Sequence, residues 1–379
     1  MSGFSSKIYP IEVQPHPNAD RIEIARVRDY QSIVLKDEFQ NGDLVAYIPE
    51  QSIVPDDIIQ ELGLEGKLSG EQKNRVKAIR LRGVLSQGLV YPVRDGKIKG
   101  VEVVEGQDVT DLLGLTKWEP PIPESMDGEF KTAYGKVLKF DVENIKMWPD
   151  VFYMDEEVVV TEKLHGTFVC FGRYRGPGVG SDDGFWRRLL RTLTPWRDRS
   201  EWIVHSKGLG EKGLAFKLNR HNKKKNVYVR IFHEMKSQLE LLDSFASSSS
   251  SWFVCGEIIG KGVQDLRYGE SKKVFAAFDM FVTDLDVPLG KFLDHDAFCS
   301  MMEFADIDMA PVLFEGPYEG AVVQEQTSGR TAWRPGLAQI REGCVIKPRF
   351  ERRDLELGRV ILKSVSEKYL TRKGGTEHN

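Results

Sequence analysis

The chain has 379 residues, of which 41% are hydrophobic and 29% are charged, and it contains 35 glycines. This is the composition of an ordinary globular protein with room for two or three domains. The net charge of −4 argues against a surface that binds polyanions everywhere, so any nucleic-acid site must be local. The four cysteines lie far apart in the sequence, which argues against a disulfide framework and against structural zinc. No stretch is apolar over the length of a membrane span and the N-terminus has no signal-peptide pattern, so we expect a soluble, intracellular protein, cytoplasmic by default.

Residues 1–116 are predicted to form a small β-barrel. Strand-like runs lie at 22–27, 32–35, 44–48 and 88–92, and one helix is expected at 56–62. The run from His16 to Glu23 resembles the opening of the OB-fold tRNA-binding modules that are attached to some synthetases. OB barrels commonly hold single strands or oligonucleotide ends on one face. In the alternative interpretation, His16 and Asp20 only brace a turn.

A strongly basic run follows within the same domain. Its cations are Arg75, Lys77, Arg80 and Arg82, and their spacing puts several of them on shared faces. These four residues are candidates for RNA binding through phosphate contacts. The alternative is an ordinary solvated face, which is the usual explanation of a charge run.

The clearest domain boundary is the proline-rich segment at 117–136, which we expect to be a linker. The second domain is predicted to occupy 137–379, with a surface insertion at 176–200. Glycines at 208, 210 and 213 fit the pattern G-x-G-x-x-G. The surrounding residues do not alternate between strands and helices, so a dinucleotide-binding fold is not predicted.

The most informative stretch of the second domain runs from Thr161 to Thr167 and reads TEKLHGT. β-Branched and aromatic residues flank it on both sides, which predicts two neighbouring strands with Gly166 at the turn between them. Lys163 is therefore expected where a buried strand opens into a loop. A lysine in that position either extends to solvent or is held inward for chemistry.

Four segments farther along the chain each place a charged or aromatic residue beside a strand-like run. These residues are Glu257, Phe278, Glu342 and Lys363. Each alone is explained by ordinary packing or by a structural ion pair. Together with Lys163 they match what a nucleoside triphosphate and a metal ion require. The aromatic ring would stack on the base, the carboxylates would hold ribose and Mg²⁺, and the lysines would hold phosphates.

This ordered set of segments resembles the motifs of the covalent nucleotidyltransferase superfamily, and in particular the ATP-dependent RNA ligases that carry an N-terminal OB-fold domain. Lys163-Leu164-His165-Gly166 is similar to the K-x-H-G motif of several RNA ligases, and Ser206-Lys207-Gly208 is similar to the next motif. The resemblance implies that Lys163 is the catalytic nucleophile that carries AMP.

The resemblance also implies roles for other side chains. The nucleotide-binding residues it implies are Glu162, Lys163, Lys207, Glu257, Phe278 and Lys363. Among them, Phe278 would stack on adenine, Glu257 would hold the ribose, and Lys207 would serve a phosphate. Glu342 would hold the metal ion through water, and Glu257 is a second candidate metal ligand.

The chain departs from the family pattern at three positions. Phe168 stands where several RNA ligases carry Asn, position 361 is Ile where the last motif often has a second lysine, and Lys207 stands where some relatives have Arg. Lys363 then works alone, or together with Arg359 or Lys347. A lysine at 207 also loses the two-pronged grip that a guanidinium has on phosphate.

The fold implied by the resemblance is α+β, with an N-terminal OB-type β-barrel followed by an antiparallel-sheet nucleotidyltransferase (adenylyltransferase) domain. The function implied is ATP-dependent joining of RNA 3′-OH and 5′-phosphate ends at nicks in duplex nucleic acid, through lysyl-AMP and adenylylated RNA. The metal would be Mg²⁺, with Mn²⁺ as a substitute, and we expect a monomer. Because the nucleotide-site residues come from one contiguous stretch, the pocket is expected to close without the barrel.

Two alternatives stay open at this point. A GTP-dependent, capping-type guanylyltransferase shares the lysine chemistry, but it usually shows K-x-D-G and carries its OB domain after the transferase domain. A non-enzymatic RNA-binding OB protein is supported only by the OB-like start of the chain, and it would form no covalent adenylate.

Overall fold

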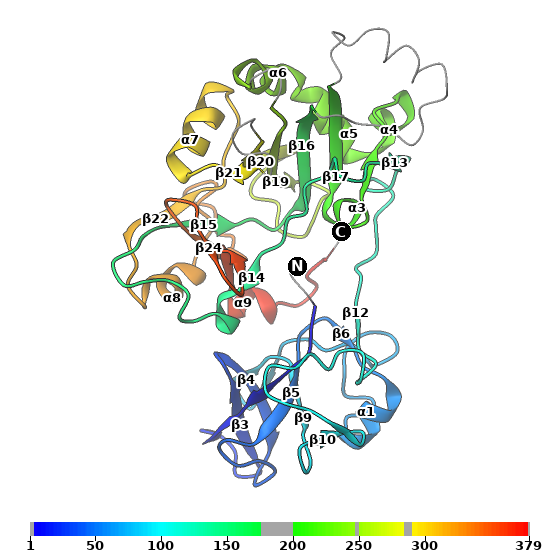
Figure 1. The fold of residues 1–379 in the computed structure, drawn as a ribbon, viewed down its shortest axis with the longest axis vertical. Coiled ribbons are helices and arrows are strands. Elements are labelled where there is room, and N and C mark those ends of the chain that lie inside the picture. Colours follow the sequence, from blue (N-terminus) through cyan, green and yellow to red (C-terminus); the bar gives the residue numbers. More distant parts are fainter. Residues whose placement is uncertain (1–3, 176–199, 247–249, 284–289, 378–379) are drawn as a thin grey trace.

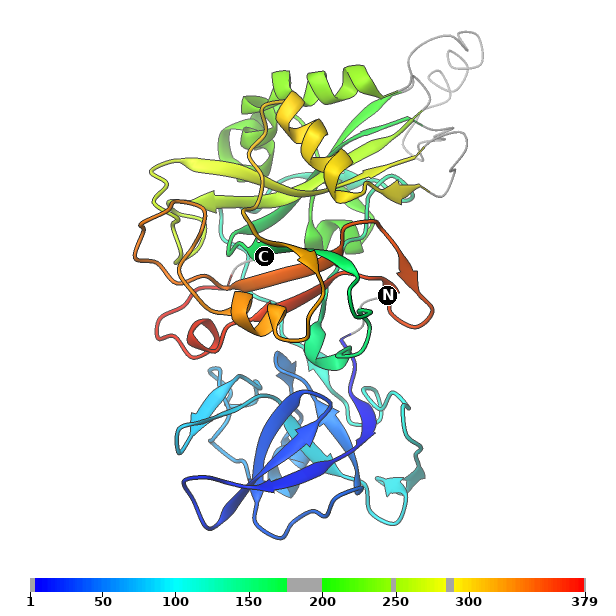
Figure 2. The ribbon, with the colours of Figure 1, turned by 90° about the vertical axis from the view of Figure 1, so that its left-hand side faces the viewer.

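The computed structural model describes residues 4–175, 200–246, 250–283 and 290–377. The insertion expected at 176–200 lies almost entirely outside the described residues. A β-rich N-terminal domain lies at one end of the molecule, and a larger domain with two sheets lies at the other end (Figures 1 and 2). The predicted α+β architecture is confirmed. Among the described residues, no helix is long and apolar enough to cross a membrane.

The N-terminal domain is built from short antiparallel strands around one helix. Two three-stranded sheets have the orders β1-β5-β9 and β2-β3-β4, and the remaining strands form pairs. The strands are β1 (Lys7–Pro10), β2 (Glu12–Pro15), β3 (Ile22–Val27), β4 (Tyr30–Leu35), β5 (Leu44–Ile48), β6 (Ser52–Ile53), β7 (Ile79–Leu81), β8 (Val84–Ser86), β9 (Leu89–Pro92), β10 (Lys97–Ile98), β11 (Val101–Glu102) and β12 (Thr116–Lys117). Helix α1 (Asp56–Glu61) buries Ile58 and Ile59 in the core of this domain. The expected strands and helix are all present.

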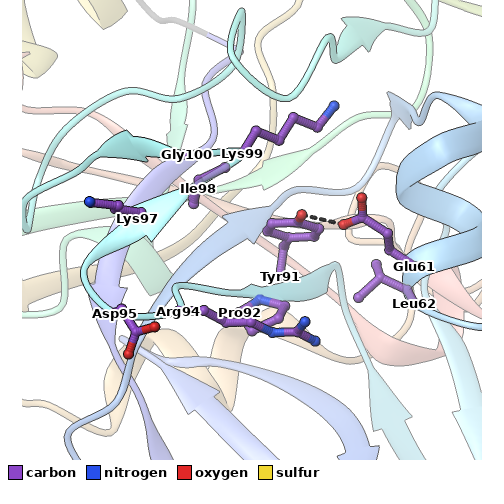
Figure 3. A pocket seen from close by; sticks show the side chains of 10 residues that line it. All are labelled: Glu61, Leu62, Tyr91, Pro92, Arg94, Asp95, Lys97, Ile98, Lys99 and Gly100. Atoms are coloured by element: carbon purple, nitrogen blue, oxygen red, sulfur yellow. Dashed lines mark hydrogen bonds between the residues drawn. The ribbon is translucent and has the colours of Figure 1, made fainter.

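A hollow of about 610 Å³ lies on this domain between α1 and the strands β9 and β10 (Figure 3). Tyr91 donates its hydroxyl hydrogen to Glu61, and burial together with this carboxylate raises the pKa of Tyr91 to about 12. Lys99 Nζ lies 2.6 Å from Asp57 Oδ2. Glu61, which lines the hollow, and Asp57 on the same helix thus both have partners from the same domain.

The larger domain contains two five-stranded sheets, with the orders β14-β26-β23-β15-β22 and β17-β16-β19-β20-β21. Their strands are β14 (Glu143–Asn144), β15 (Glu157–Lys163), β16 (Thr167–Tyr174), β17 (Glu201–Ser206), β19 (Trp252–Gly260), β20 (Lys273–Val282), β21 (Lys291–Phe292), β22 (Val312–Pro317), β23 (Gly343–Pro348) and β26 (Leu362–Val365). All neighbours are antiparallel except β14 and β26. These sheets are unlike the parallel sheet of a dinucleotide-binding fold, in agreement with the weak glycine pattern.

Three amphipathic helices cover one face of the second sheet, as Figure 2 shows. They are α5 (Val227–Glu234), α6 (Lys236–Phe245) and α7 (His295–Phe304). Their apolar sides pack on β16 and β19 through side chains such as Phe171 and Trp252, both fully buried. Burying a side chain such as Phe171 contributes about 1.5–3 kcal/mol. This core holds the second sheet rigid, and the opposite face of the sheet is left to face the first sheet.

The shorter elements complete the larger domain. They are η1 (Ile145–Met147), α3 (Lys207–Glu211), α4 (Arg220–Lys225), α8 (Val322–Thr327), α9 (Glu367–Leu370), β13 (Phe130–Thr132), β18 (Leu214–Phe216), β24 (Arg353–Asp354) and β25 (Gly358–Arg359). β13 pairs with β18, and Met126 belongs to the core under the second sheet. The second half of the segment expected as a linker therefore packs on the larger domain.

Candidate active site

Lys163 is the last residue of β15, and strand pairing brings Glu342 beside it. Lys163 lies opposite Gly343 in the antiparallel pair of β15 and β23, so Glu342, one residue before β23, reaches the same end of the sheet. Lys163 Nζ is 2.7 Å from Glu342 Oε1. Glu342 is only 7% exposed and the neighbouring Glu162 only 2%. Of the two alternatives for the lysine, the structure shows the inward position.

Gly166 owes its identity to a close approach between two backbones. A Cβ added there would lie 2.4 Å from the carbonyl oxygen of Ile258 on β19. The sequence predicted Gly166 at a turn between two neighbouring strands. Gly166 does lie at a bend between β15 and β16, but these strands belong to different sheets. A side chain is excluded at Gly166 because the loop after Lys163 runs directly against the second sheet.

Glu257 enters the site from β19, opposite Phe168 of β16. Burial raises the pKa of Glu257 to about 8, with Glu342 adding to the rise and Lys163 and Lys207 opposing it. Burial lowers the pKa of Lys163, but Glu342 and Glu257 outweigh this effect and hold that pKa above its ordinary value. In this arrangement Lys163 is an ammonium ion between two acidic side chains.

A cationic region lies on the other side of β23. Lys363 of β26 is opposite Val345, and Lys207 at the start of α3 places its Nζ 2.7 Å from Asp141 Oδ1. Burial, and then Lys207, lower the pKa of Lys363 to about 8, while Asp141 opposes the change. Burial raises the pKa of Asp141, but Lys207 and Lys363 outweigh it and leave that pKa lowered. Two lysines that share one carboxylate make a region suited to an anion.

Phe278 of β20 belongs to an aromatic cluster with Phe140 and Phe168. The ring centroid of Phe140 lies 5.2 Å from that of Phe278 and 5.6 Å from that of Phe168. A cavity of about 240 Å³ borders Phe278 and is also lined by Thr161 of β15 and by Pro311. Because Thr161 is two residues before Lys163, the cavity lies along the strand that carries the lysine.

The two carboxylates beside Lys163 fit a divalent cation. Glu257 Oε2 and Glu342 Oε2 are buried and have no hydrogen-bond partner among the residues that the structure describes, and carboxylate oxygens are preferred ligands of Mg²⁺. Within the described ranges there is no group of three or more His, Cys, Asp and Glu side chains that could hold a metal. The residues present therefore fit a cation that keeps several water ligands.

Comparison with known proteins shows the family. The family model described as RNA ligase matches residues 156–365, which is more than half of the chain. The chain belongs to the RNA ligase family. A second model, described as an OB-fold domain, matches residues 7–93 and confirms the fold expected for the N-terminal domain. Family membership favours the ligase over a capping-type guanylyltransferase and over a non-enzymatic RNA-binding protein.

The fold of the ligase is also similar to solved structures of an RNA ligase from Naegleria gruberi. One variant of that enzyme, with ATP and Mn, aligns with a TM-score of 0.73 and 22% identity, covering 96% of this chain and 98% of that chain. A second variant, with AMP and Mn, has a TM-score of 0.74 and 22% identity, covering 97% and 98%. The same enzyme with PPi has a TM-score of 0.74 and 22% identity, also covering 97% and 98%. No significant match is found among curated proteins.

Lys347 and Arg359, the two residues that the sequence offered as helpers of Lys363, contact a different carboxylate. Lys347 Nζ lies 3.1 Å from Asp279 Oδ1, and Arg359 Nη1 lies 2.6 Å from Asp279 Oδ2. Asp279 is fully buried, so it needs both cations. Lys363 therefore accompanies Lys207 at the cationic region while Lys347 and Arg359 serve another carboxylate.

The basic run of the N-terminal domain meets the end of the chain. Arg75 pairs with Glu377, Lys77 Nζ lies 3.9 Å from Glu377 Oε1, and Arg80 Nη2 lies 2.8 Å from Glu367 Oε1. The fourth cation, Arg82, is exposed at the turn between β7 and β8. Three of the four candidate RNA-binding cations of the ligase thus contact carboxylates from the other domain. These contacts cannot be predicted from the spacing of charges in the sequence.

The structure adds partners of His165 that the sequence analysis did not name, which are Asp265, Tyr369 and Arg372. His165 Nε2 lies 2.9 Å from Asp265 Oδ1, and His165 Nδ1 lies 2.9 Å from the hydroxyl of Tyr369. Arg372 Nε donates to Asp265 Oδ2 over 3.0 Å. Burial raises the pKa of Asp265, but hydrogen bonds from His165 and Arg372 outweigh this and hold that pKa well below its ordinary range. These partners are about 100 and 200 residues from His165 in sequence, so no local pattern connects them.

Proposed function

We propose that the protein is an ATP-dependent RNA ligase that joins RNA 3′-OH and 5′-phosphate ends at nicks in duplex nucleic acid through a lysyl-AMP intermediate. The observation that carries the proposal is Lys163, held inward between two carboxylates and next to two further lysines, inside the segment that matches the RNA ligase family. The neighbours in fold support it, because their structures hold ATP, AMP with Mn, and PPi.

In the first step, the neutral amine of Lys163 attacks the α-phosphorus of ATP. The new bond joins Nζ to phosphorus, the bond from phosphorus to the bridging oxygen breaks, and pyrophosphate leaves. Lys363 and Lys207 would stabilise negative charge on the transferring phosphoryl group and on the leaving group. Phe278 would stack on adenine at the cavity that it lines with Thr161. Glu162, buried beside the nucleophile, and Glu257 would complete the contacts to the nucleotide.

The proposed step requires a change in the surroundings of Lys163. Lys163 must lose a proton before it attacks, yet Glu342 and Glu257 raise its pKa. The negative charge that raises the pKa of Lys163 therefore has to be neutralised when substrates bind. A divalent cation, held by Glu342 through water and with Glu257 as a further ligand, would supply the opposing positive charge.

In the second step the AMP passes from Lys163 to a 5′-phosphate of the nucleic acid, and in the third a 3′-hydroxyl attacks that activated end and releases AMP. We place the nucleotide chemistry in residues 137–379 and the holding of RNA in the OB domain, residues 1–116, joined through 117–136. Arg82 at the exposed turn of β7 and β8 is the member of the basic run best placed for a phosphate contact.

Intact mass spectrometry tests the first step. The purified protein is incubated with Mg²⁺ and either ATP or GTP, and we expect the mass of one added AMP with ATP only. Addition of GMP would favour the capping-type alternative, and the absence of any adduct would favour a non-enzymatic protein.

A substrate panel tests the second half of the proposal. Labelled ends are supplied as single strands, as a nick with an RNA 3′-OH strand, and as the same nick with a DNA 3′-OH strand. We expect sealing to be fastest at the nick with the RNA 3′-OH strand, because duplex RNA is held through its shape and its 2′-hydroxyls. Equal sealing of free single strands would contradict the preference for nicks.

A further inference from the structure

A continuous set of polar contacts connects the OB domain with the loop that follows the nucleophile. It starts at Arg75, whose guanidinium carbon lies 3.2 Å from the centroid of the Trp118 ring. The side chain of Arg75 is buried, with 8% exposed. Arg75 Nε also donates to Gln51 Oε1 over 2.8 Å. This anchored arginine pairs with Glu377 near the end of the chain. The OB domain therefore holds the C-terminal segment at a fixed point.

The residue before Glu377 carries the contact into the larger domain. Thr376 donates its backbone N–H to Asp265 Oδ1 over 2.9 Å, and its hydroxyl accepts from the backbone N–H of Asp265 over 2.8 Å. Its carbonyl oxygen lies 3.1 Å from His165 Nε2. Arg372, in the same segment, donates to Asp265 over 3.0 Å. The segment thus contacts both Asp265 and His165.

His165 is held on both ring nitrogens. The pattern fits Nε2–H donating to Asp265, with Nδ1 accepting from the hydroxyl of Tyr369. The same Nδ1 lies 3.7 Å from Glu342 Oε2, and Glu342 Oε1 contacts Lys163. The position of this histidine therefore bears directly on the carboxylate that holds the nucleophile.

We propose that residues 367–377 form a strap, anchored on Arg75 of the OB domain, that positions His165 and through it the pair of Glu342 and Lys163. In Figures 1 and 2 the C-terminal segment, in red, lies at the side of the larger domain that faces the OB domain. The strap makes lysine adenylylation depend on the OB domain, although Glu342, the carboxylate that pairs with Lys163 among the described residues, belongs to the larger domain. The expectation from sequence, that the nucleotide pocket closes without the barrel, makes the opposite prediction. The kinetic part of the inference rests on the proposed ligase function.

Hydrogen exchange measured by mass spectrometry on the full-length protein tests the strap without relying on activity. In Glu377→Ala we expect faster exchange in the peptides that contain residues 163–168 and 264–268, and not only in the terminal peptide. Unchanged exchange at 163–168 would overturn the proposal, because it would show that the end of the chain can be released without affecting His165.

Single-turnover formation of lysyl-AMP provides the second readout. Loss of the strap should misplace Lys163 without removing a contact to the nucleotide. We therefore expect Glu377→Ala to slow lysyl-AMP formation about tenfold at saturating ATP. The ATP concentration for half-maximal rate should stay close to that of the wild type, since none of the residues assigned to nucleotide binding lies within 367–377. Glu377→Asp should recover much of the rate. A rate equal to that of the wild type in Glu377→Ala would overturn the kinetic part.

Glu367→Gln is the matched control on the same segment. Glu367 also pairs with the OB domain, through Arg80, but both side chains are more than a third exposed, and exposed pairs of this kind contribute little. We expect exchange and adenylylation close to those of the wild type. A loss as large as that of Glu377→Ala would mean that any contact between the domains suffices, which contradicts the path through Thr376.

A double-mutant cycle identifies the anchor. If Arg75 and Glu377 act through one contact, Arg75→Ala with Glu377→Ala should slow adenylylation no more than either change alone. Additive losses would overturn the assignment of Arg75 as the anchor. If the wild type forms no lysyl-AMP, the proposed function fails, whereas the exchange result still decides whether the strap exists.

Discussion

Two lysines on strands that flank β23 have opposite electrostatic surroundings. Lys163 of β15 and Lys363 of β26 sit on either side of this strand, and burial lowers the pKa of both. Near Lys163 the carboxylates of Glu342 and Glu257 reverse that effect and raise the pKa. Near Lys363 the next largest influence is Lys207, another cation, and the pKa falls to about 8.

Burial acts in the same direction on both lysines and is the largest influence on Lys363, so the charged neighbours account for the difference between the two pKa values. Lys363 is already close to losing its proton at neutral pH, while the proposed nucleophile is not. The pKa values alone would favour Lys363 as the nucleophile. The resemblance to the K-x-H-G motif assigns the proposed reaction to Lys163 instead, so under this proposal the surroundings of Lys163 have to change when ATP and metal bind. The following substitutions test this contrast.

Loss of the nucleophile should have the largest effect. Lys163→Arg and Lys163→Ala should both form no detectable lysyl-AMP, because guanidinium does not deprotonate at working pH and alanine has no amine. Intact mass after incubation with ATP and Mg²⁺ measures this. An adduct in either variant would place the nucleophile elsewhere, with Lys363 as the first residue to examine.

The two carboxylates beside Lys163 should come next. Glu342→Ala and Glu257→Ala should each slow adenylylation by about a hundredfold. If Glu342 serves the metal, more Mg²⁺ or Mn²⁺ should partly restore that variant and leave Glu257→Ala unchanged. Metal titration of the single-turnover rate measures the difference, and equal rescue of both variants would refute the division of roles.

Lys363→Met should separate stability from activity. The folded-state pKa of Lys363, about 8, lies below the unfolded value of about 10.4, so the unfolded chain binds more protons between these pH values. The positive charge of Lys363 therefore lowers the free energy of unfolding below pH 8. This effect is lost as the pH rises from about 8 to about 10.4. At pH 7 we expect the free energy of unfolding to increase by about 1–2 kcal/mol in Lys363→Met, while adenylylation falls about tenfold.

Lys163→Met is the matched control for stability. The pKa of Lys163 is raised in the folded protein, so its charge adds stability below the unfolded pKa, and this is lost only as pH rises through the folded value. We expect Lys163→Met to lower the free energy of unfolding at pH 7. Denaturant unfolding at pH 7 and pH 10 measures both variants. A change of the same sign in the two variants would contradict the contrast between the lysines.

The smallest effect is expected at Lys207. Lys207→Arg keeps the positive charge and the ion pair with Asp141, and its planar fork can hold a phosphate through two hydrogen bonds. We expect adenylylation within about threefold of the wild type. Single-turnover rates measure this, and Lys207→Met, which removes the charge, should be clearly slower than Lys207→Arg.

Much of the architecture was open to prediction because it depends on short-range patterns. The strands at 22–27 and 44–48 and the helix at 56–62 follow from apolar alternation and turn residues, and each is close to its expected bounds. The strand that ends at Lys163 was equally clear, because an unbroken β-branched run is typical of a buried strand. The resemblance of the ordered motifs then indicated the RNA ligase family, which the family match shows.

The sequence by itself determined which strands and strand ends carry the lysines and carboxylates, because the spacing of residues along a strand is set locally. Only the tertiary structure decided which of these charges meet. Asp141 joins Lys207 and Lys363, Asp279 takes Lys347 and Arg359, and Glu377 takes Arg75. Electrostatic interactions depend on distance in space and on burial, and these partners lie up to 302 residues apart in the chain. The pKa of each lysine, and the tie between the OB domain and His165, therefore exist only once the strands of both sheets are assembled.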